Sequence, residues 1–256
     1  MKRQDPALLD CRGRRVTKAV LLAAGAGRRL LPATRLTPKP LLQVSGRHVI
    51  DFALKSCLEA GVTQVFLVVG AFGDAVAAHV RDRVRDVVQL SVCWQQRLDG
   101  TASALLAAKS SPDFDPSTPA IVMATDYVIS SDYVSSLASF HCAGIQDASI
   151  GLYWNAPDKV VESSLVTVDS QGRLINLVEK PSVLPSVASL SAALVYIIQP
   201  RLLDKLCSVQ PSPRGERELP VALQSIIADG FEVRGLIQRN PTIWESELRQ
   251  LLRRDA

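Results

Sequence analysis

The strongest constraint on the fold is a regular alternation of strand-like and helix-like segments through the first half of the chain. Apolar runs typical of buried strands lie at residues 19–24, 64–69, 90–94 and 120–123. Helical spacing of apolar residues follows each of them, at 49–60, 73–85, 101–110 and 132–143. Because parallel strands need long crossover connections, this order predicts an α/β fold, with a mainly parallel sheet covered by helices on both faces.

The second half of the chain changes character. Strand-like segments at 149–154, 164–168, 173–178 and 192–198 follow one another with few helices between them, which predicts antiparallel pairing. Helical patterns return at 200–207, 218–228 and 244–253, with a further strand at 232–237. Residues 1–15 are basic and poor in apolar residues, so we expect a flexible basic arm ahead of a single domain over residues 16–256.

Composition excludes several classes of protein. The chain has 47% hydrophobic and 21% charged residues, which is typical of a soluble globular protein. Its net charge of +4 is dispersed, so nucleic-acid binding is not indicated, and no apolar run approaches the roughly 18 residues that a membrane span needs. The five cysteines are widely spaced, which favours neither a zinc site nor a disulfide framework and fits a cytoplasmic location.

A glycine loop follows the first predicted strand. Gly25 and Gly27 come directly after the apolar run, and Arg28 and Arg29 are next, so backbone N–H groups and a guanidinium would converge where phosphate could bind. A dinucleotide-binding GxGxxG loop would open straight into a helix, whereas Pro32 resists one here. A nicotinamide-dependent oxidoreductase is therefore the weaker interpretation, and a plain glycine turn at the sheet edge is the simplest alternative.

A lysine held between two prolines follows this loop. Pro38 and Pro40 flank Lys39, and we expect them to keep it in an extended segment that cannot be helical. Together with Arg29, the fixed ammonium could bracket a triphosphate and offset the charge that develops when the α-phosphate is attacked. A solvated loop lysine is the alternative.

Residues 21–50, LLAAGAGRRLLPATRLTPKPLLQVSGRHVI, resemble a known signature. The sugar-1-phosphate nucleotidyltransferases carry the pattern LAGGxGxRLxPxTxxxPKPLLxVxGxPxI, so spacing as well as composition agrees over thirty residues. The resemblance implies a three-layer α/β/α Rossmann-like nucleotide-diphospho-sugar transferase fold with a mixed, mainly parallel sheet. It also implies a nucleotide half over residues 16–130 and an acceptor half over 131–256.

The resemblance assigns roles to individual residues. Arg29, Lys39 and Asp126 take the catalytic positions. The nucleotide would be bound by Leu22, Ala23, Ala24, Gly25, Gly27, Arg29, Gln95, Gly100 and Thr101.

Gln95 stands five residues before Gly100 and Thr101 and is similar to the family's base-reading glutamine. The amide group has both a donor and an acceptor for the edge of a base, and a glycine lets the backbone approach closely. Gln96 is an alternative register for the same role, and a solvated surface glutamine remains the simple interpretation.

Two acidic positions complete the expected site. Asp126 follows the strand AIVMA, where open α/β sheets bind ligands, and is expected to hold Mg²⁺, although a cap on the next turn would also explain it. The family's usual Gly-Asp is here Thr125-Asp126. Glu179 and Lys180 in LVEKP resemble the sugar-phosphate site, with the glutamate on sugar hydroxyls and the lysine on phosphate, against the alternative of a surface ion pair.

The chain departs from the family at two places. Leu194 stands where many members have glycine beside the sugar, so the acceptor pocket could be tighter or more apolar, which leaves a small phosphate or phosphonate open. Neither Pro241 nor Ile243 is acidic, although the family often places a second metal-binding aspartate there. Glu245 could substitute, but a helix dipole explains it more simply.

We therefore expect an enzyme that joins a nucleoside triphosphate to a sugar 1-phosphate or a similar small phosphorylated acceptor and releases pyrophosphate. The missing carboxyl-terminal aspartate motivates an alternative, a catalytically reduced homologue that binds a sugar nucleotide and regulates a partner enzyme. No nucleic-acid or membrane partner is expected, and the sequence is compatible with a homo-oligomer.

Overall fold

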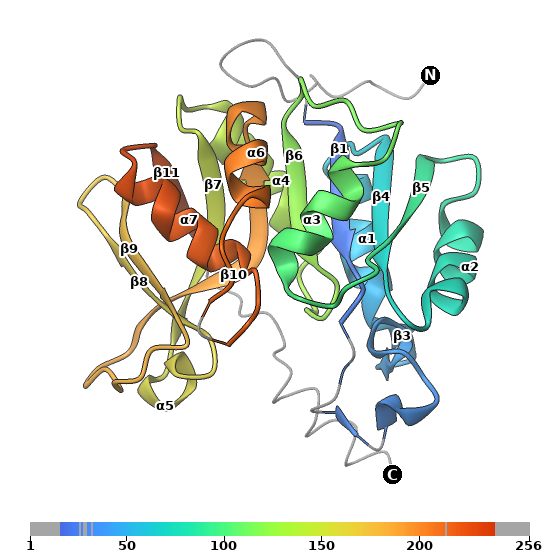
Figure 1. Cartoon of the computed structure of the whole chain (residues 1–256), viewed down its shortest axis with the longest axis horizontal. Coiled ribbons are helices and arrows are strands. Elements are labelled where there is room, and N and C mark those ends of the chain that lie inside the picture. Colours follow the sequence, from blue (N-terminus) through green and yellow to red (C-terminus); the bar gives the residue numbers. More distant parts are fainter. Residues whose placement is uncertain (1–15, 26, 28–29, 32, 213, 239–256) are drawn as a thin grey trace.

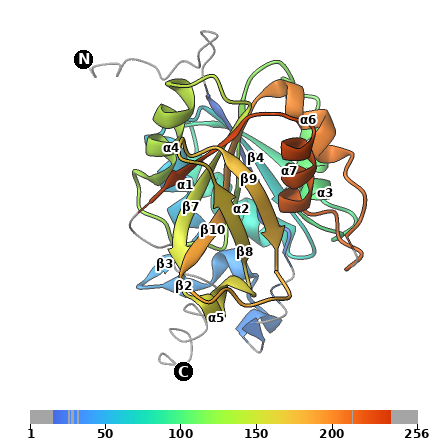
Figure 2. The same ribbon diagram turned by 90° about the vertical axis from the view of Figure 1, so that its left-hand side faces the viewer.

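A nine-stranded sheet lies between two layers of helices (Figure 1). The computed structural model describes residues 16–25, 27, 30–31, 33–212 and 214–238. The main path of the sheet has the strand order β11-β7-β10-β6-β1-β4-β5, and β8 and β9 are attached through β10. Turned by 90°, the sheet has α3, α6 and α7 on one side and α1 and α4 on the other (Figure 2).

The strands of the large sheet fall into a parallel group and a mainly antiparallel group. In chain order, the nine strands are β1 Lys18–Leu22, β4 Gln64–Val69, β5 Gln89–Trp94, β6 Ala120–Ala124, β7 Ala148–Asn155, β8 Ser164–Val168, β9 Leu174–Glu179, β10 Ser189–Ile198 and β11 Val233–Ile237. A separate hairpin is formed by β2 Gln43–Val44 and β3 Arg47–His48.

Seven α-helices and two short 3₁₀ helices connect the strands in the described part of the chain. They are η2 Ala33–Arg35, η3 Lys39–Leu41, α1 Val49–Glu59, α2 Gly73–Val84, α3 Thr101–Lys109, α4 Tyr133–Cys142, α5 Pro157–Val160, α6 Pro200–Cys207 and α7 Leu219–Ala228. Over the residues that the structure describes, no helix has the length and apolarity needed to cross a bilayer.

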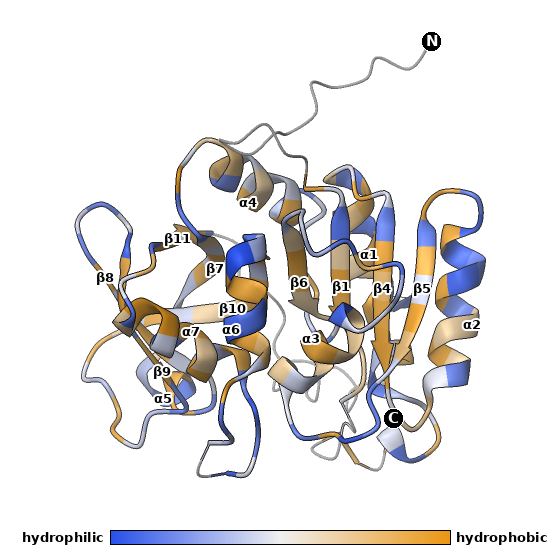
Figure 3. Ribbon diagram, turned by 45° about the horizontal axis from the view of Figure 1, so that its top comes forward, coloured by the Kyte–Doolittle hydropathy of each residue, from blue (hydrophilic) through white to orange (hydrophobic). Residues whose placement is uncertain are grey.

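The parallel strands at the centre of the sheet are buried on both faces. β1 pairs in parallel with β4 on one side and β6 on the other, and all five residues of β1 are buried. Their apolar character runs along most of each strand (Figure 3). Continuous apolar runs are typical of such two-sided burial, which is why the sequence identified these strands. The alternation of strands and helices and the mixed, mainly parallel sheet are confirmed.

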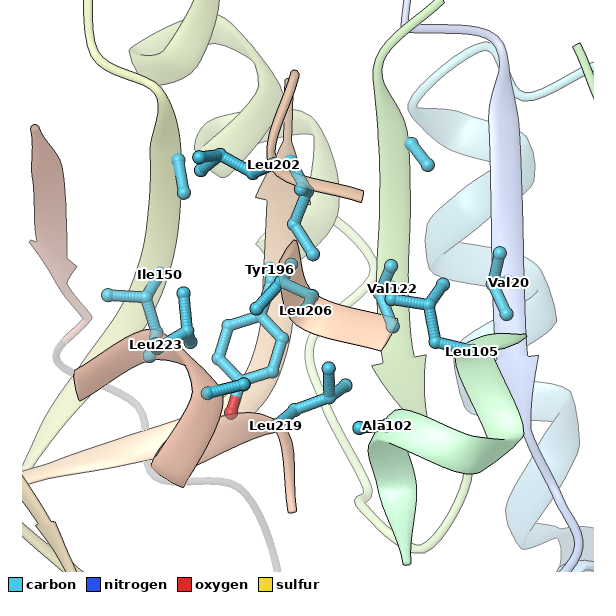
Figure 4. Packing of buried hydrophobic residues seen from close by; sticks show 14 of the residues in the cluster. Val20, Ala102, Leu105, Val122, Ile150, Tyr196, Leu202, Leu206, Leu219 and Leu223 are labelled. Carbon is cyan, nitrogen blue, oxygen red and sulfur yellow. The ribbon is translucent and has the colours of Figure 1, made fainter. Parts of the chain in front are cut away.

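Two hydrophobic cores cover the two faces of the sheet. One packs α3, α6 and α7 against the strands, and in it the ring of Tyr196 lies between Leu206, Leu219 and Leu223 (Figure 4). The other core packs α1, α2 and α4 against the opposite face. Its residues, of which Leu54 is one, are fully or almost fully buried. Both cores contain residues from before and after residue 130, because β10 pairs with β6 and also with β7.

Some sequence expectations differ from the structure. The segment around Lys39 was expected to be extended, but Lys39–Leu41 is a 3₁₀ turn that follows extended Pro38. Pro40 is tolerated there because an N–H in the first turn of a helix has no internal partner to lose. The antiparallel pairing expected for residues 149–198 is confirmed, and β11, for which no direction was predicted, pairs in parallel with β7. The predicted arm 1–15 and final helix 244–253 lie outside the described residues.

A buried lysine stands at the amino end of β1, at the edge of the sheet away from the glycine loop. Lys18 is 2% exposed, donates a hydrogen bond to the backbone carbonyl of Asp115, and places its Nζ 4.1 Å from the centroid of the Phe114 ring. Burial lowers the pKa of Lys18 from 10.5 to about 8, and the nearby Asp115 carboxylate opposes this shift.

The stability of the protein should therefore depend on Lys18 in a defined pH window. Between pH 8 and 10.5 the unfolded chain keeps a proton on this lysine that the native state has released, so the contribution of Lys18 to stability grows as pH rises and is lost as pH falls through 8. The melting temperature of the native protein minus that of Lys18→Met should rise across this window in calorimetric scans. A difference that is constant from pH 7 to 11 would contradict the assignment.

Candidate active site

A large cavity opens at the carboxyl ends of β1 and β6. Its volume is about 870 Å³, within the range of small-molecule sites. All of the site residues predicted from the sequence and described by the structure line it. They are Leu22, Ala23, Ala24, Gly25, Gly27, Lys39, Gln95, Gly100, Thr101, Asp126, Glu179, Lys180 and Leu194. Arg29 lies outside the described residues.

The glycine loop packs directly against the lysine turn. Gly27 has a φ of +61°, and a Cβ there would lie 2.9 Å from Thr34 Cγ2 and 3.2 Å from Lys39 Cβ. Thr34 Oγ1, in η2, donates a hydrogen bond of 2.8 Å to the Gly27 carbonyl, which holds η2 against the glycine loop. Both the backbone conformation and the close approach favour glycine at position 27. A Cβ at Gly25 would have no described atom within 4 Å, so the loop leaves open space there.

Lys39 and Asp126 form an ion pair in the floor of the cavity. Lys39 Nζ lies 2.7 Å from Asp126 Oδ2, and the lysine is 9% exposed. The other carboxylate oxygen, Oδ1, is buried and has no hydrogen-bond partner among the described residues. Thr125, in the position where a glycine was expected, donates from Oγ1 to the Leu22 carbonyl and links the ends of β6 and β1. A cation and an anion are therefore fixed side by side.

His48 supports the lysine turn and was not identified from the sequence. Its Nδ1 lies 2.7 Å from the Leu41 carbonyl, so a protonated Nδ1 would donate to the last residue of the turn. The ring of His79 packs edge-on against it with centroids 4.5 Å apart, and His79 Nε2 lies 2.7 Å from Asp51. The signature described above has proline at position 48. Only the three-dimensional position of the ring reveals its contact with the turn.

Gln95 lies in the cavity, whereas Gln96 is exposed and does not line it. The Gln95 backbone N–H donates to the Val69 carbonyl at 2.9 Å, and its side-chain Nε2 donates to the Gly100 carbonyl at 2.9 Å. Gly100 has a φ of +120°, a backbone conformation that residues with a side chain rarely adopt. The side-chain bond ties the glutamine to the glycine turn that was expected to lie beside the base.

In the described part of the chain, a divalent cation at Asp126 would need further ligands from a substrate or water. Asp126 Oδ1 is a buried carboxylate oxygen without a partner among the described residues, a suitable ligand for a hard cation. The described residues contain no group of three or more histidine, cysteine, aspartate or glutamate side chains that could hold a metal. The candidate positions Pro241 and Ile243, and also Glu245, lie outside the described residues.

Glu179 and Lys180 line the cavity where β9 ends. Lys180 has a φ of +47°, and its backbone N–H donates to the Ser163 carbonyl at 2.7 Å. Its Nζ lies 4.0 Å from a carboxylate oxygen of Glu179 and 4.0 Å from one of Glu218. Leu194 lines the same cavity, at a register shift in β10 between Ala192 and Tyr196. It also packs in part against the core on the α7 side.

Several residues that line the cavity were missed by sequence reasoning. Tyr153 and Ser163 share a hydrogen bond of 2.9 Å, and Asn155 donates to Ser191 at 3.3 Å. Burial raises the pKa of Tyr153 well above its ordinary range, so the hydroxyl stays neutral. The aromatic, polar and charged lining residues that were missed include Tyr127, Tyr153, Trp154, Asn155, Lys159, Glu162, Ser163, Glu216 and Glu218. Of these residues, Asn155 is the one that a local sequence pattern could have identified, because it is a polar residue at the end of an apolar strand.

Comparison with known proteins adds an independent observation. The family model described as "Nucleotidyl transferase" matches residues 18–245. The low-salt glycan biosynthesis nucleotidyltransferase Agl11 of Haloferax volcanii is 29% identical, over 84% of this chain and 58% of its own length. A glucose-1-phosphate thymidylyltransferase of Streptomyces griseus is 27% identical, over 86% of this chain and 60% of its own. The chain thus spans about 60% of the length of these two relatives.

One relative and one solved structure match over most of their own length. The UTP–glucose-1-phosphate uridylyltransferase AglF of Haloferax volcanii is 26% identical, over 83% of this chain and 84% of its own. The crystal structure of a UDP-glucose pyrophosphorylase complexed with UDP-glucose has a TM-score of 0.77 at 20% identity, covering 89% of this chain and 92% of that one. At this identity the structural likeness concerns the fold, and it confirms the expected three-layer α/β fold.

The paired charges of Lys39 and Asp126 should have opposite effects on anion binding. Without metal, Lys39→Met should weaken the binding of inorganic tripolyphosphate about tenfold, because a charge-assisted hydrogen bond is worth about 1.5–3 kcal/mol. Asp126→Asn should strengthen that binding, because it removes a negative charge 2.7 Å from the ammonium. Isothermal titration calorimetry measures both.

Lys55→Met provides the matched control. Lys55 is a half-exposed lysine on α1 that pairs with Glu59, away from the cavity. Its replacement should leave the affinity within about twofold of the native value. If Lys39→Met and Lys55→Met bound tripolyphosphate with equal affinity, Lys39 would not be part of the anion site.

Proposed function

Because this chain belongs to the nucleotidyl transferase family, we propose that it joins a nucleoside triphosphate to a sugar 1-phosphate or a similarly small phosphate or phosphonate. The observation that carries the proposal is that one cavity contains both sets of predicted binding residues. It is lined by Gly25, Lys39 and Gln95 and also by Glu179 and Lys180, so the two substrates could lie next to each other in it. Such an arrangement would turn a bimolecular step into one between held reactants.

The proposed reaction is an in-line displacement at the α-phosphorus. An oxygen of the acceptor phosphate attacks this atom, the bond to the oxygen that bridges the α- and β-phosphates breaks, and its electron pair leaves with pyrophosphate. An ionised acceptor phosphate has no proton to lose, so no general base is required. Lys39, in the floor of the cavity, would stabilise the charge that develops on the phosphoryl oxygens. Arg29 is proposed for the same role from its position in the sequence motif.

Gln95 and the glycine turn are proposed to select the base. The Gln95 Nε2 already donates to the Gly100 carbonyl, so the Oε1 atom is oriented by that bond and could accept a hydrogen bond from a base edge. Backbone at residues 22–25 lines the adjacent wall. Which triphosphate is preferred would follow from this edge contact.

Asp126 is proposed to hold Mg²⁺ through its buried Oδ1 atom, with substrate phosphate oxygens and water as further ligands. When bound, the ion supplies neutralisation of the phosphate charge. Lys39 Nζ, now paired with Oδ2, remains beside the same carboxylate and would face the phosphates with it. The Glu179 carboxylate is proposed to accept hydrogen bonds from acceptor hydroxyls, and the Lys180 ammonium to contact the acceptor phosphate.

A pyrophosphate-release screen tests the proposal. Four or five nucleoside triphosphates are combined with a panel of sugar 1-phosphates and small phosphonates in the presence of Mg²⁺. We expect turnover with at least one pair. If triphosphates or sugar nucleotides bind but no pair turns over, the alternative of a catalytically reduced binding homologue is favoured. If none of them binds, the proposed site is wrong.

Asp126→Asn should lower turnover at least about tenfold and weaken the dependence of rate on Mg²⁺ concentration, because the amide is a poorer ligand for a hard cation than a carboxylate. Initial rates across a metal titration measure both effects. The tripolyphosphate affinity of the variant, expected to be undiminished, shows that the anion site is intact. Native turnover with an unchanged metal requirement would exclude Asp126 as a ligand.

Leu194→Gly tests the size of the acceptor pocket. Removing this side chain should improve the use of hexose 1-phosphates relative to the native acceptor, since a few methylenes in a pocket are worth roughly 1–3 kcal/mol of discrimination. The specificity ratio and the melting temperature are measured together, because Leu194 also packs in part against the core. A large loss of stability with an unchanged ratio would mean that the side chain serves the core instead.

A further inference from the structure

A segment of the acceptor half lies directly on the glycine turn of the nucleotide half. This segment, residues 216–219, leads into α7 and is called the strap below. Its Arg217 donates from the backbone N–H to the Asp99 carbonyl at 2.6 Å and accepts at its own carbonyl from Ala102 N–H at 2.9 Å. The Leu219 N–H donates to Thr101 Oγ1 at 2.8 Å. The strap therefore contacts both sides of Gly100.

The contact is close enough to dictate the residue at the turn. A Cβ built on Gly100 would collide with the carbonyl group of Arg217, so the strap and a side chain at position 100 exclude each other. The Arg217 carbonyl also accepts from the N–H of the second residue of α3, an N–H that the helix leaves without an internal partner. No side chain caps this helix at Gly100. The acceptor half thus supplies the cap for a helix of the nucleotide half.

A side-chain ion pair locks the same contact. Arg217 Nη1 lies 2.7 Å from Asp99 Oδ2, with the guanidinium 40% and the carboxylate 26% exposed. The second oxygen of Asp99, Oδ1, is buried without a hydrogen-bond partner among the described residues. Loss of the guanidinium would leave the whole carboxylate unpaired at the edge of the turn. The stability of this geometry therefore depends on Arg217 more than an exposed pair would suggest.

The next residue of the strap lies beside the lysine that is proposed to contact the acceptor. Glu218 is 6% exposed, forms an ion pair with Arg214, and lies 4.0 Å from Lys180 Nζ. Adjacent residues of one short segment thus contact the turn that holds Gln95 and also Lys180. A displacement of the strap would move both.

We propose that Arg217 is a positioning residue for the nucleotide base, supplied from the acceptor half of the chain. It acts through Asp99 and Gly100 by fixing the turn whose carbonyl orients the Gln95 amide. The inference rests on the proposed function, since it concerns which triphosphate that reaction uses. It predicts that nucleotide choice is sensitive to a residue that is not itself expected to touch the nucleotide.

The test compares kcat/KM for the preferred triphosphate with kcat/KM for the next best one. Arg217→Ala should lower this ratio about tenfold, and Arg217→Lys should restore part of it, because a lysine keeps the charge but offers no planar fork. Asp99→Ala should have a similar effect. The double variant should be no worse than either single variant, since both remove the same contact.

Arg234→Ala is the matched control. Arg234 is a partly exposed arginine paired with Glu232 at the opposite edge of the sheet, on β11, and its loss should leave the ratio unchanged. A ratio unchanged in Arg217→Ala, in a variant whose melting temperature is close to native, would overturn the inference. Additive effects of Arg217→Ala and Asp99→Ala in the double variant would also overturn it.

A second measurement does not depend on turnover. Amide hydrogen exchange of a peptide covering residues 96–104 should be faster in Arg217→Ala than in the native protein and in Arg234→Ala. Without the ion pair to Asp99 the strap is held less firmly, so the Ala102 N–H more often loses its hydrogen bond to the backbone carbonyl of residue 217. Unchanged exchange would overturn the inference. If the native protein released no pyrophosphate with any substrate pair, only the proposed function would be contradicted. Faster exchange in Arg217→Ala would still support the inference that Arg217 fixes the turn at Gly100.

Discussion

Burial of β1 on both faces determines where the rest of the site can lie. Its neighbours β4 and β6 run parallel to it, so the carboxyl ends of all three strands meet at one edge of the sheet. Neither face of the strand can accept a ligand, because two hydrophobic cores cover them. The glycine loop after β1 and Asp126 after β6 are thereby brought to the same cavity, where loops are free to carry polar groups.

The charges in the cavity are compensated before any substrate arrives. Lys39 lies 2.7 Å from Asp126, and Lys180 lies 4.0 Å from two carboxylates. Unpaired charges this close to a protein interior would be costly, so each ammonium has a carboxylate beside it. A bound phosphate must therefore share each cation with its present partner. The ion pairs fix the positions of the two ammonium groups before a substrate binds, and they lower the affinity of the site for anions.

Sequence reasoning predicted those parts of the site that sit in a motif and missed those that depend on long-range packing. Lys39, Gln95 and Asp126 each follow a recognisable local pattern, and all three line the cavity. Arg217 contacts Asp99 across a separation of 118 residues, which no local spacing reveals. His48 is only seven residues from Leu41, but no motif marks it, because the signature has proline at this position. The 3₁₀ turn at Lys39 was missed because the two prolines suggested an extended chain, while the first turn of a helix accepts proline.

Strand β10 runs antiparallel to both β6 and β7, so it joins the strand that ends at Ala124, two residues before Asp126, to the strand that ends at Asn155. Many two-part enzymes close over their substrates by a hinge between rigid bodies. Here, rotating residues 16–130 against the rest of the chain would shear the buried backbone hydrogen bonds between β6 and residues Val195–Ile198 of β10. Any widening of the cavity must therefore come from its rim of loops, so substrates pass in and out while the sheet beneath them stays rigid.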